Sequence, residues 1–261
     1  MSAIVWFELN YMKLNQDKCH FLIFGNTPEY LWAKVGEHVI WESKQEKLLG
    51  LTIDKQLNFN AHLSDICKRA STKVTALARL VRFISFEKKR LLMKSFIESQ
   101  FSYCPLIWMF CSRIMNKKIN YIHERALRLV YEDYTSSFND LLVKDKSVCI
   151  HHRNIQKVAI EMFKVKHNMC PEAFQMLFNE NGNSKSNTYF HRPNINTVFK
   201  GEYSLRSFGP IVWDNMIPKN IKEITMLKQF KKEINEWIPN NCLCRLCKDY
   251  VHNLGFVTIF E

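Results

Sequence analysis

Glycine and proline are scarce in this chain of 261 residues, which contains seven of each. This is about half the share of average usage, so there is little material for a glycine-rich barrel or a turn-dense sandwich. Long hydrophobic runs are also missing, since the longest covers nine residues, 103–111. A membrane-spanning helix needs about 20 apolar residues. We therefore expect no transmembrane helix and no membrane partner.

The sequence also lacks a secretory leader and an even set of cysteines. The first ten residues contain no basic segment, and Glu8 interrupts their apolar stretch, so we expect no signal peptide. The nine cysteines are an odd number and are scattered except for one C-terminal cluster, which argues against a disulfide scaffold. We expect an intracellular protein, in the cytoplasm or the nucleus, with reduced cysteines.

Catalytic motifs are absent as well. The sequence has no phosphate-binding glycine loop, no Gly-x-Ser-x-Gly and no His-Glu-x-x-His. Glu132 and Asp133 are adjacent acids, but they follow a helical segment without strand flanks, so we do not assign them to a metal. We therefore assign no catalytic residue and expect no obligate small-molecule ligand.

Positive charge is what the chain has in excess. Its 37 Lys and Arg residues against 25 Asp and Glu residues give a net charge of +12. This balance favours a polyanionic partner, although charge alone does not separate nucleic acid from acidic lipid.

The apolar patterns predict an α+β fold, in which a small N-terminal helix-plus-hairpin sheet precedes a mostly helical body. We expect a helix at 4–14, strands at 19–24 and 47–53, and a hairpin at 32–41 around Gly36 and Glu37. From residue 61 onward the spacing of apolar residues becomes helical. We predict four segments, 1–57, 58–180, 181–239 and a Cys-rich tail at 240–261, with a flexible loop at 179–187.

Three successive predicted helices combine an apolar stripe with a basic face. The first begins at residue 61, and its basic face carries Lys68, Arg69, Lys73, Arg79 and Arg82. The second covers 87–103, with an inward set Leu91, Leu92 and Phe96 and an outward set Lys88, Lys89, Arg90 and Lys94. The third covers 115–130, and its basic face carries Lys117, Lys118, Arg125 and Arg128. Further helices are expected at 137–143, 150–166, 171–178 and 225–238, the last capped by Thr225.

Cations at helical spacing suit a phosphate backbone, because each neutralised phosphate releases condensed counterions. The alternative is that these residues only solvate exposed helix faces, and for a single helix this alternative is the better one. The repetition over three helices favours RNA or an RNA/DNA duplex as the partner.

The C-terminal cluster has the spacing of a metal site. Cys242, Cys244 and Cys247 are followed by His252, and three thiolates with one imidazole complete a tetrahedral zinc site. Zinc ribbons usually contain a second Cys-x2-Cys pair, which is missing here. A reduced tail without metal is the open alternative, and so is the choice between Cys242 and His252 as the weaker ligand.

Several segments together resemble a known family. They are KLNQDK at 13–18, CHFLIFG at 19–25, KLLGLTID at 47–54, LNFNAHL at 57–63, NYIHERALR at 120–128, RNI at 153–155, GPIVW at 209–213 and FK at 230–231. In this order, and followed by the cysteine tail, they resemble the C-terminal part of a non-LTR retrotransposon reverse transcriptase of the jockey or chicken-repeat type. The resemblance spans nearly the whole chain.

The resemblance implies roles for particular segments. Residues 1–57 resemble the end of the polymerase palm, in which Lys18 lies near the incoming triphosphate. Leu49 and Gly50 match the primer grip, where a glycine allows close approach of two backbones. The basic helix from residue 61 resembles the thumb, which follows the template-primer duplex.

The sequence departs from this family in its acids. Complete members use three aspartates, two of them in a Tyr/Phe-Ala-Asp-Asp turn, whereas this chain has eight Asp and no two are adjacent. Magnesium is therefore expected only for a complete parent polymerase. We expect a truncated fragment, catalytically inactive alone, with residual binding of template-primer and an apolar surface exposed where the palm is missing. The alternatives are the thumb part of an active polymerase joined to an upstream half, and a domesticated helical protein-interaction module.

Overall fold

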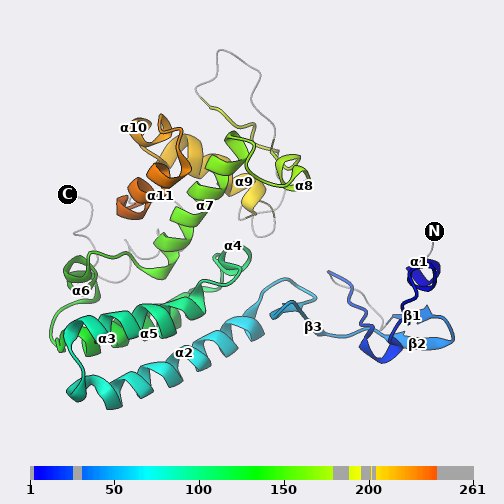
Figure 1. Ribbon diagram of the computed structural model, residues 1–261, viewed down its shortest axis with the longest axis horizontal. Coiled ribbons are helices and arrows are strands. Elements are labelled where there is room, and N and C mark those ends of the chain that lie inside the picture. Colours follow the sequence, from blue (N-terminus) through cyan, green and yellow to red (C-terminus); the bar gives the residue numbers. More distant parts are fainter. Residues whose placement is uncertain (1–2, 26–30, 179–187, 195–200, 202–203, 240–261) are drawn as a thin grey trace. The chain divides into compact units, whose positions relative to one another are not determined.

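The chain forms two small sheets and a mostly helical body, which confirms the predicted α+β class. The computed structural model describes residues 3–25, 31–178, 188–194, 201 and 204–239 (Figure 1). The chain divides into two compact units, Met1–Asp65 and Ile66–Glu261. Nothing in this division tests the four predicted segments, which stay a prediction.

The described part of the first unit contains a short α-helix, a single turn of 3₁₀ helix and two hairpins. Its elements are α1 (Ala3–Leu9), η1 (Gln16–Lys18), β1 (Trp32–Val35), β2 (His38–Trp41), β3 (Gln45–Leu48) and β4 (Leu51–Asp54). The β1–β2 hairpin confirms the prediction at 32–41, with Val35 paired to His38 across the turn. The helix predicted at 4–14 ends early, because Tyr11 has a left-handed backbone with a φ of 54°.

Two strand predictions in the first unit were wrong. Residues 47–53 do not form one strand, because Leu49 and Gly50 have φ angles of 48° and 85° and reverse the chain between β3 and β4. Two successive residues with positive φ are typical of a type I′ hairpin turn. Residues 19–24 do not form a strand either, since Phe21 makes only an isolated bridge to Glu42. An apolar run alone does not supply a pairing partner.

One face of the β1–β2 hairpin leaves large apolar side chains in water. Trp32 and Trp41 are directly paired across the strands and are 57% and 63% exposed. Val39 lies on the same face and is also exposed. These side chains form an exposed apolar surface on this sheet, and its connection with a missing palm stays a prediction.

The predicted first basic helix is confirmed as α2 (Asn60–Leu80). Asp54 fixes the segment that leads into α2, because its carboxylate accepts hydrogen bonds from the backbone N–H groups of Asn58 (3.0 Å) and Phe59 (2.7 Å). The apolar spacing predicted a stripe of eight residues on this helix, and six of them are buried: Leu63, Ile66, Cys67, Ala70, Val74 and Leu77. The other two were predicted wrongly or only in part, since Ala78 is exposed and Val81 is half-buried at the end of the helix. Burial of this stripe fixes which side of α2 faces solvent.

The helix predicted at 87–103 is confirmed as a continuous helical segment from residue 86 to residue 101, whose hydrogen-bond pattern changes along its length. It consists of α3 (Phe86–Leu92), η3 (Met93–Ile97) and η4 (Glu98–Phe101), after η2 (Val81–Phe83) and before α4 (Pro105–Trp108). The predicted inward face was wrong, since Leu91 and Phe96 are 64% and 53% exposed. The buried row is Lys89, Met93, Ile97 and Phe101.

The next two helices agree with the prediction. They are α5 (Arg113–Tyr131) and α6 (Phe138–Asp145). Ser137 begins α6 with a capping box, in which its hydroxyl accepts the Asp140 N–H and its own N–H donates to the Asp140 carboxylate. Glu132 and Lys146 end α5 and α6 in the left-handed conformation.

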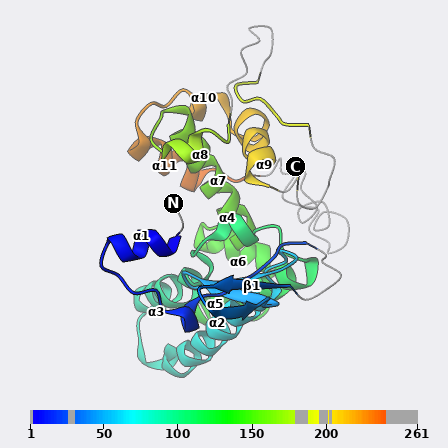
Figure 2. The same cartoon turned by 90° about the vertical axis from the view of Figure 1, so that its right-hand side faces the viewer.

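The C-terminal helices pack around α7. Their bounds are α7 (Ile150–Lys166), α8 (Glu172–Gln175), α9 (Leu205–Ile211), η6 (Val212–Met216), α10 (Lys219–Lys222) and α11 (Leu227–Glu236). Figures 1 and 2 both show α9 and α11 beside α7. The rings of Phe163 on α7 and Phe230 on α11 stack with centroids 4.3 Å apart. Trp213 on η6 also stacks on Phe230. The bounds of α7 match the predicted helix.

The predicted cap of the last helix was wrong. Met226 is the N-cap residue of α11 and provides no side-chain hydrogen bond, so Thr225 lies outside the helix. The packing of Phe230 and Ile234, both buried, determines where α11 forms. None of the helices in the described part of the chain is long and apolar enough to cross a bilayer.

Candidate nucleic-acid interface

Four cations lie exposed on α2 and η2: Lys68, Arg69, Arg79 and Arg82. They face solvent because the apolar stripe of the same helix is buried. The helix contains a single acid, Asp65. Among the residues that the structure describes, none of the four cations forms an ion pair. Their charges are therefore available to an anionic partner.

Lys73 differs from the other predicted cations of this helix. It is half-buried, and its Nζ lies 5.9 Å from the centroid of the Phe96 ring. An ammonium group at this distance is attracted by the ring face. Lys73 thus lies at the border of the basic face of α2, where its ammonium group contacts the exposed Phe96 ring of η3.

The second predicted basic face is partly used inside the protein. Lys89 and Arg90 were predicted to point outward, but Lys89 is buried with its Nζ 2.5 Å from Glu132 Oε1. Arg90 donates to the buried carboxylate of Asp145. These two cations stabilise the fold, and only Lys88 and Lys94 of this set are exposed.

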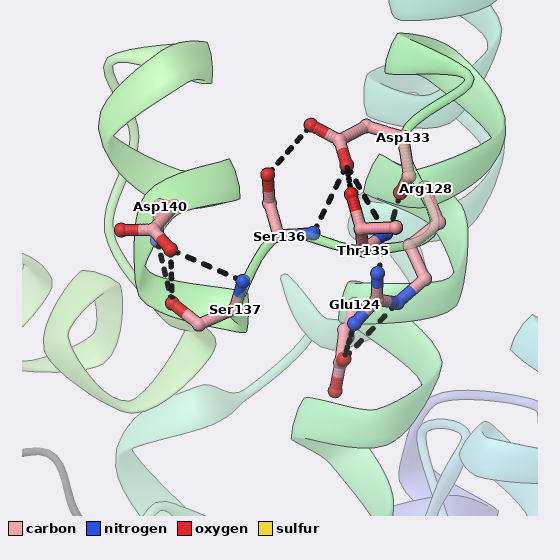
Figure 3. A network of polar contacts seen from close by, with 7 residues as sticks. All are labelled: Glu124, Arg128, Asp133, Thr135, Ser136, Ser137 and Asp140. Atoms are coloured by element: carbon pink, nitrogen blue, oxygen red, sulfur yellow. Dashed lines mark hydrogen bonds and ion pairs between the residues drawn. The ribbon is translucent and has the colours of Figure 1, made fainter.

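The third basic face is divided in the same way. Arg128 binds Glu124 one turn away, with Nη2 2.6 Å from Oε1, and donates to the carbonyl of Asp133 (Figure 3). Arg125 lies over the Tyr121 ring at 5.7 Å. Lys117 and Lys118 are exposed, as predicted.

Asp133 organises the loop between α5 and α6. Its carboxylate accepts hydrogen bonds from the backbone N–H and the hydroxyl of Ser136, at 3.0 Å and 2.8 Å, and from Thr135 (Figure 3). These bonds and that from Lys144 hold the pKa of Asp133 well below its ordinary range. The Asp133 carboxylate therefore stabilises the conformation of the loop between α5 and α6.

The residues that the resemblance assigns to the polymerase palm lie in the first unit. Lys18 is the last residue of η1 and is exposed. Leu49 and Gly50 form the exposed turn between β3 and β4. The cations of α2 from residue 66 onward belong to the second unit.

The predicted zinc ligands Cys242, Cys244, Cys247 and His252 lie outside the described residues, so the zinc site stays a prediction. In the described ranges, no three His, Cys, Asp or Glu side chains are grouped closely enough to hold a metal ion.

Three features of the structure were not predicted. Phe83 follows Arg82 directly and is 82% exposed. Glu98 is buried between His123 and Arg153. Cys149 precedes α7, beside His152. The only sequence feature that could have indicated an exposed Phe83 was its position beyond the apolar stripe of α2. The burial of Glu98 depends on residues that folding brings together, and the environment of Cys149 depends on local geometry.

Comparison of the chain with models of known protein families, with characterised proteins and with solved structures finds no match.

Proposed function

We propose that the basic face of α2 binds the sugar–phosphate backbone of RNA or of an RNA/DNA duplex. The observation that carries this proposal is the separation of the two sides of α2. Six residues of its apolar stripe are buried in the core, while Lys68, Arg69, Arg79 and Arg82 are exposed and have no acidic partner among the described residues.

The geometry suits a phosphate chain. From residue 68 to residue 82 the cations extend along about 20 Å of helix axis. One strand of a duplex carries a phosphate about every 3.4 Å of its axis, so several phosphates lie within reach of this row. Contacts of this type give affinity and register but little base specificity.

The resemblance to a reverse transcriptase extends the proposal. We propose that the chain is a fragment of an RNA-directed DNA polymerase, with α2 in the role of the thumb, Lys18 in that of the lysine near the incoming triphosphate, and Leu49 and Gly50 in that of the primer grip. The proposed activity of the chain alone is binding and not nucleotidyl transfer, because the sequence lacks the paired aspartates with which this family holds its two magnesium ions.

A salt titration tests the binding proposal. We expect wild type to bind an RNA/DNA duplex with an affinity that falls steeply with salt, and replacement of Lys68, Arg69, Arg79 and Arg82 by Gln to weaken binding at least tenfold at low salt. The slope of log K against log salt should fall by about 3 to 4, at roughly 0.9 per lost phosphate contact.

A matched control removes the same charge elsewhere. Four exposed lysines on α10 and α11 serve for this: Lys219, Lys228, Lys231 and Lys232. Their replacement by Gln should leave the salt slope nearly unchanged. Equal losses in both variants, or no binding by wild type at low salt, would contradict an interface on α2.

The exposed tryptophans of the first unit favour a second candidate function. Trp32 and Trp41 form an apolar face of the kind that further polypeptide covers. We propose as the alternative that this chain acts as the thumb part of an active polymerase when joined to an upstream half. The coding sequence upstream of Met1 tests this: an in-frame Tyr/Phe-Ala-Asp-Asp supports it, and stop codons contradict it. A domesticated protein-interaction module predicts instead partners that remain bound after nuclease treatment.

A further inference from the structure

Phe83 lies at the end of the cation row with its ring in water. It is the last residue of η2, and 82% of it is exposed. The backbone is still α-helical at Leu80, and it is extended at Ile84, with φ −128° and ψ 151°. The core stripe of α2 ends at Leu77, so Phe83 lies beyond the part of the helix that packs inward.

Three cations lie within five residues of Phe83 in the sequence. Arg82 precedes it, Arg79 lies one turn earlier, and Lys88 follows on α3; all three are exposed and none has an ion pair within the described residues. The nearest acid along the chain is Glu87. An exposed aromatic ring among unpaired cations is the combination that proteins use for single-stranded nucleic acid, where bases stack on rings and cations follow the backbone.

We propose that Phe83 stacks on an unpaired base at the end of a duplex whose phosphates lie along α2. This inference rests on the proposed function and adds the class of ligand, a duplex with a single-stranded extension. The row from Lys68 to Arg82 holds one strand by its phosphates. The ring of Phe83 then receives the first base that is no longer paired.

An acidic membrane surface is the competing partner, and the structure favours nucleic acid. An amphipathic helix binds a bilayer by inserting its apolar face, but the apolar face of α2 is buried inside the protein. The exposed apolar residues near Phe83 are Leu80 and Phe86, which are 46% and 43% exposed. Arg79 and Arg82 flank Leu80 in the sequence, so these few side chains do not form the long apolar face with which an amphipathic helix inserts.

The test compares the full chain with three variants on two duplexes. One RNA/DNA duplex is blunt, and the other carries an unpaired extension on one strand. Phe83→Leu keeps an apolar side chain but removes the ring, and Phe83→Trp keeps a ring. Phe24→Leu is the matched control, because Phe24 is also an exposed phenylalanine and lies in the first unit.

We expect wild type and Phe83→Trp to bind the extended duplex about tenfold more tightly than the blunt one, as expected for one stacked base. Phe83→Leu should lose this preference while its affinity for the blunt duplex and its salt slope remain unchanged. Phe24→Leu should behave as wild type. Because Phe83 is exposed, circular dichroism should show the same fold for all variants.

Four results would overturn the inference, and they separate it from the proposed function. If Phe83→Leu keeps the preference, or if wild type binds both duplexes equally, the stacking site fails while binding by α2 stands. If wild type binds neither duplex at low salt, the proposed function fails as well. If Phe83→Leu instead loses binding to phosphatidylserine vesicles without any change on the duplexes, the surface is a membrane contact.

Discussion

Arg90 donates from Nε to Oδ1 of Asp145 at 2.7 Å, and the Asp145 side chain has no exposed surface. Nη2 of Arg90 also donates to the Asp145 backbone carbonyl at 2.8 Å, and Tyr131 donates its hydroxyl to the same Oδ1. Burial and the bond to Asp145 raise the pKa of Tyr131 to about 12, so its proton stays in place at neutral pH. These bonds fix α3 against the ends of α5 and α6.

Replacing Arg90 by Gln should destabilise the protein, because the buried Asp145 carboxylate loses its cation. Removing one partner of a buried ion pair costs about 3 to 5 kcal/mol, and the partial exposure of Arg90 reduces our expectation to about 2 kcal/mol. The midpoint of urea denaturation measures the loss. Lys88→Gln, at an exposed position two residues earlier, should change stability by less than about 0.5 kcal/mol. Equal midpoints for the two variants would contradict this role of Arg90.

Glu98 should make stability depend on acid pH. Arg153 Nη1 lies 2.6 Å from its Oε2 and His123 Nε2 lies 3.2 Å from its Oε1. Burial raises the pKa of Glu98, but the neighbouring His123 imidazole and the charge of Arg153 outweigh this and lower the pKa from 4.5 to about 2. Its stabilisation is therefore complete above pH 4.5 and is lost as the pH falls towards 2.

The stability difference between wild type and Glu98→Gln should consequently shrink by about 3 kcal/mol between pH 5 and pH 2. Starting at pH 5 keeps most histidine titration outside the window. Denaturant midpoints at several pH values provide the measurement, and Glu236→Gln, an exposed carboxylate at the end of α11, is the control. A difference that is constant over this range would show that Glu98 has an ordinary pKa.

The sequence was sufficient where local pattern and tertiary packing agree. α2, α5 and α7 formed where the apolar spacing predicted them, since one stripe of each is buried. The hairpin at 32–41 followed from Gly36, whose φ is positive.

The face of α3 and η3 could not be predicted, because its rotation depends on residues far along the chain. Lys89 pairs with Glu132, 43 positions later, and Arg90 pairs with Asp145, 55 positions later. Within the local sequence, Leu91 and Phe96 were the better candidates for burial. The exposure of Phe83 escaped prediction for a related reason, since it depends on where α2 stops.

Gly209 on α9 allows a close approach to α7. A Cβ at this position would lie 2.5 Å from Sδ of Met162, a side chain with no exposed surface. Gly209→Ala should therefore destabilise the protein by about 1 to 2 kcal/mol through overpacking, despite the better helix propensity of alanine. In a double-mutant cycle on denaturant midpoints, Gly209→Ala combined with Met162→Ala should cost less than the sum of the single changes. Strict additivity would exclude this contact as the cause.

The cysteine tail predicts a measurable metal content. If Cys242, Cys244, Cys247 and His252 bind zinc, purified wild type should contain about one zinc per chain. The variant with Cys244→Ser and Cys247→Ser should contain almost none, as measured by atomic emission. Cys19→Ser with Cys170→Ser controls for the loss of two thiols elsewhere. Equal and negligible zinc in wild type and variant would end the zinc prediction.

Among the described cysteines, Cys149 should have the lowest thiol pKa and should therefore react fastest with electrophiles near neutral pH. It is the half-buried N-cap residue of α7, and His152 lies within hydrogen-bonding distance one turn later. Burial raises the pKa of the Cys149 thiol, but the charge and hydrogen bond of His152 and the charge of His151 outweigh this and lower it from 9.0 to about 6. A lowered pKa means that the thiolate, the nucleophilic form, is already abundant at neutral pH.

The alkylation rate of Cys149 by iodoacetamide should therefore rise with pH to a plateau with a midpoint near 6. Peptide mass spectrometry separates this residue from the other cysteines. His152→Ala should move the midpoint upward, because the thiolate loses its principal cationic partner while its burial remains. His191→Ala removes an exposed histidine from another segment and should leave the profile unchanged. A midpoint close to 9 in wild type, or one that does not move in His152→Ala, would show that His152 does not stabilise the thiolate.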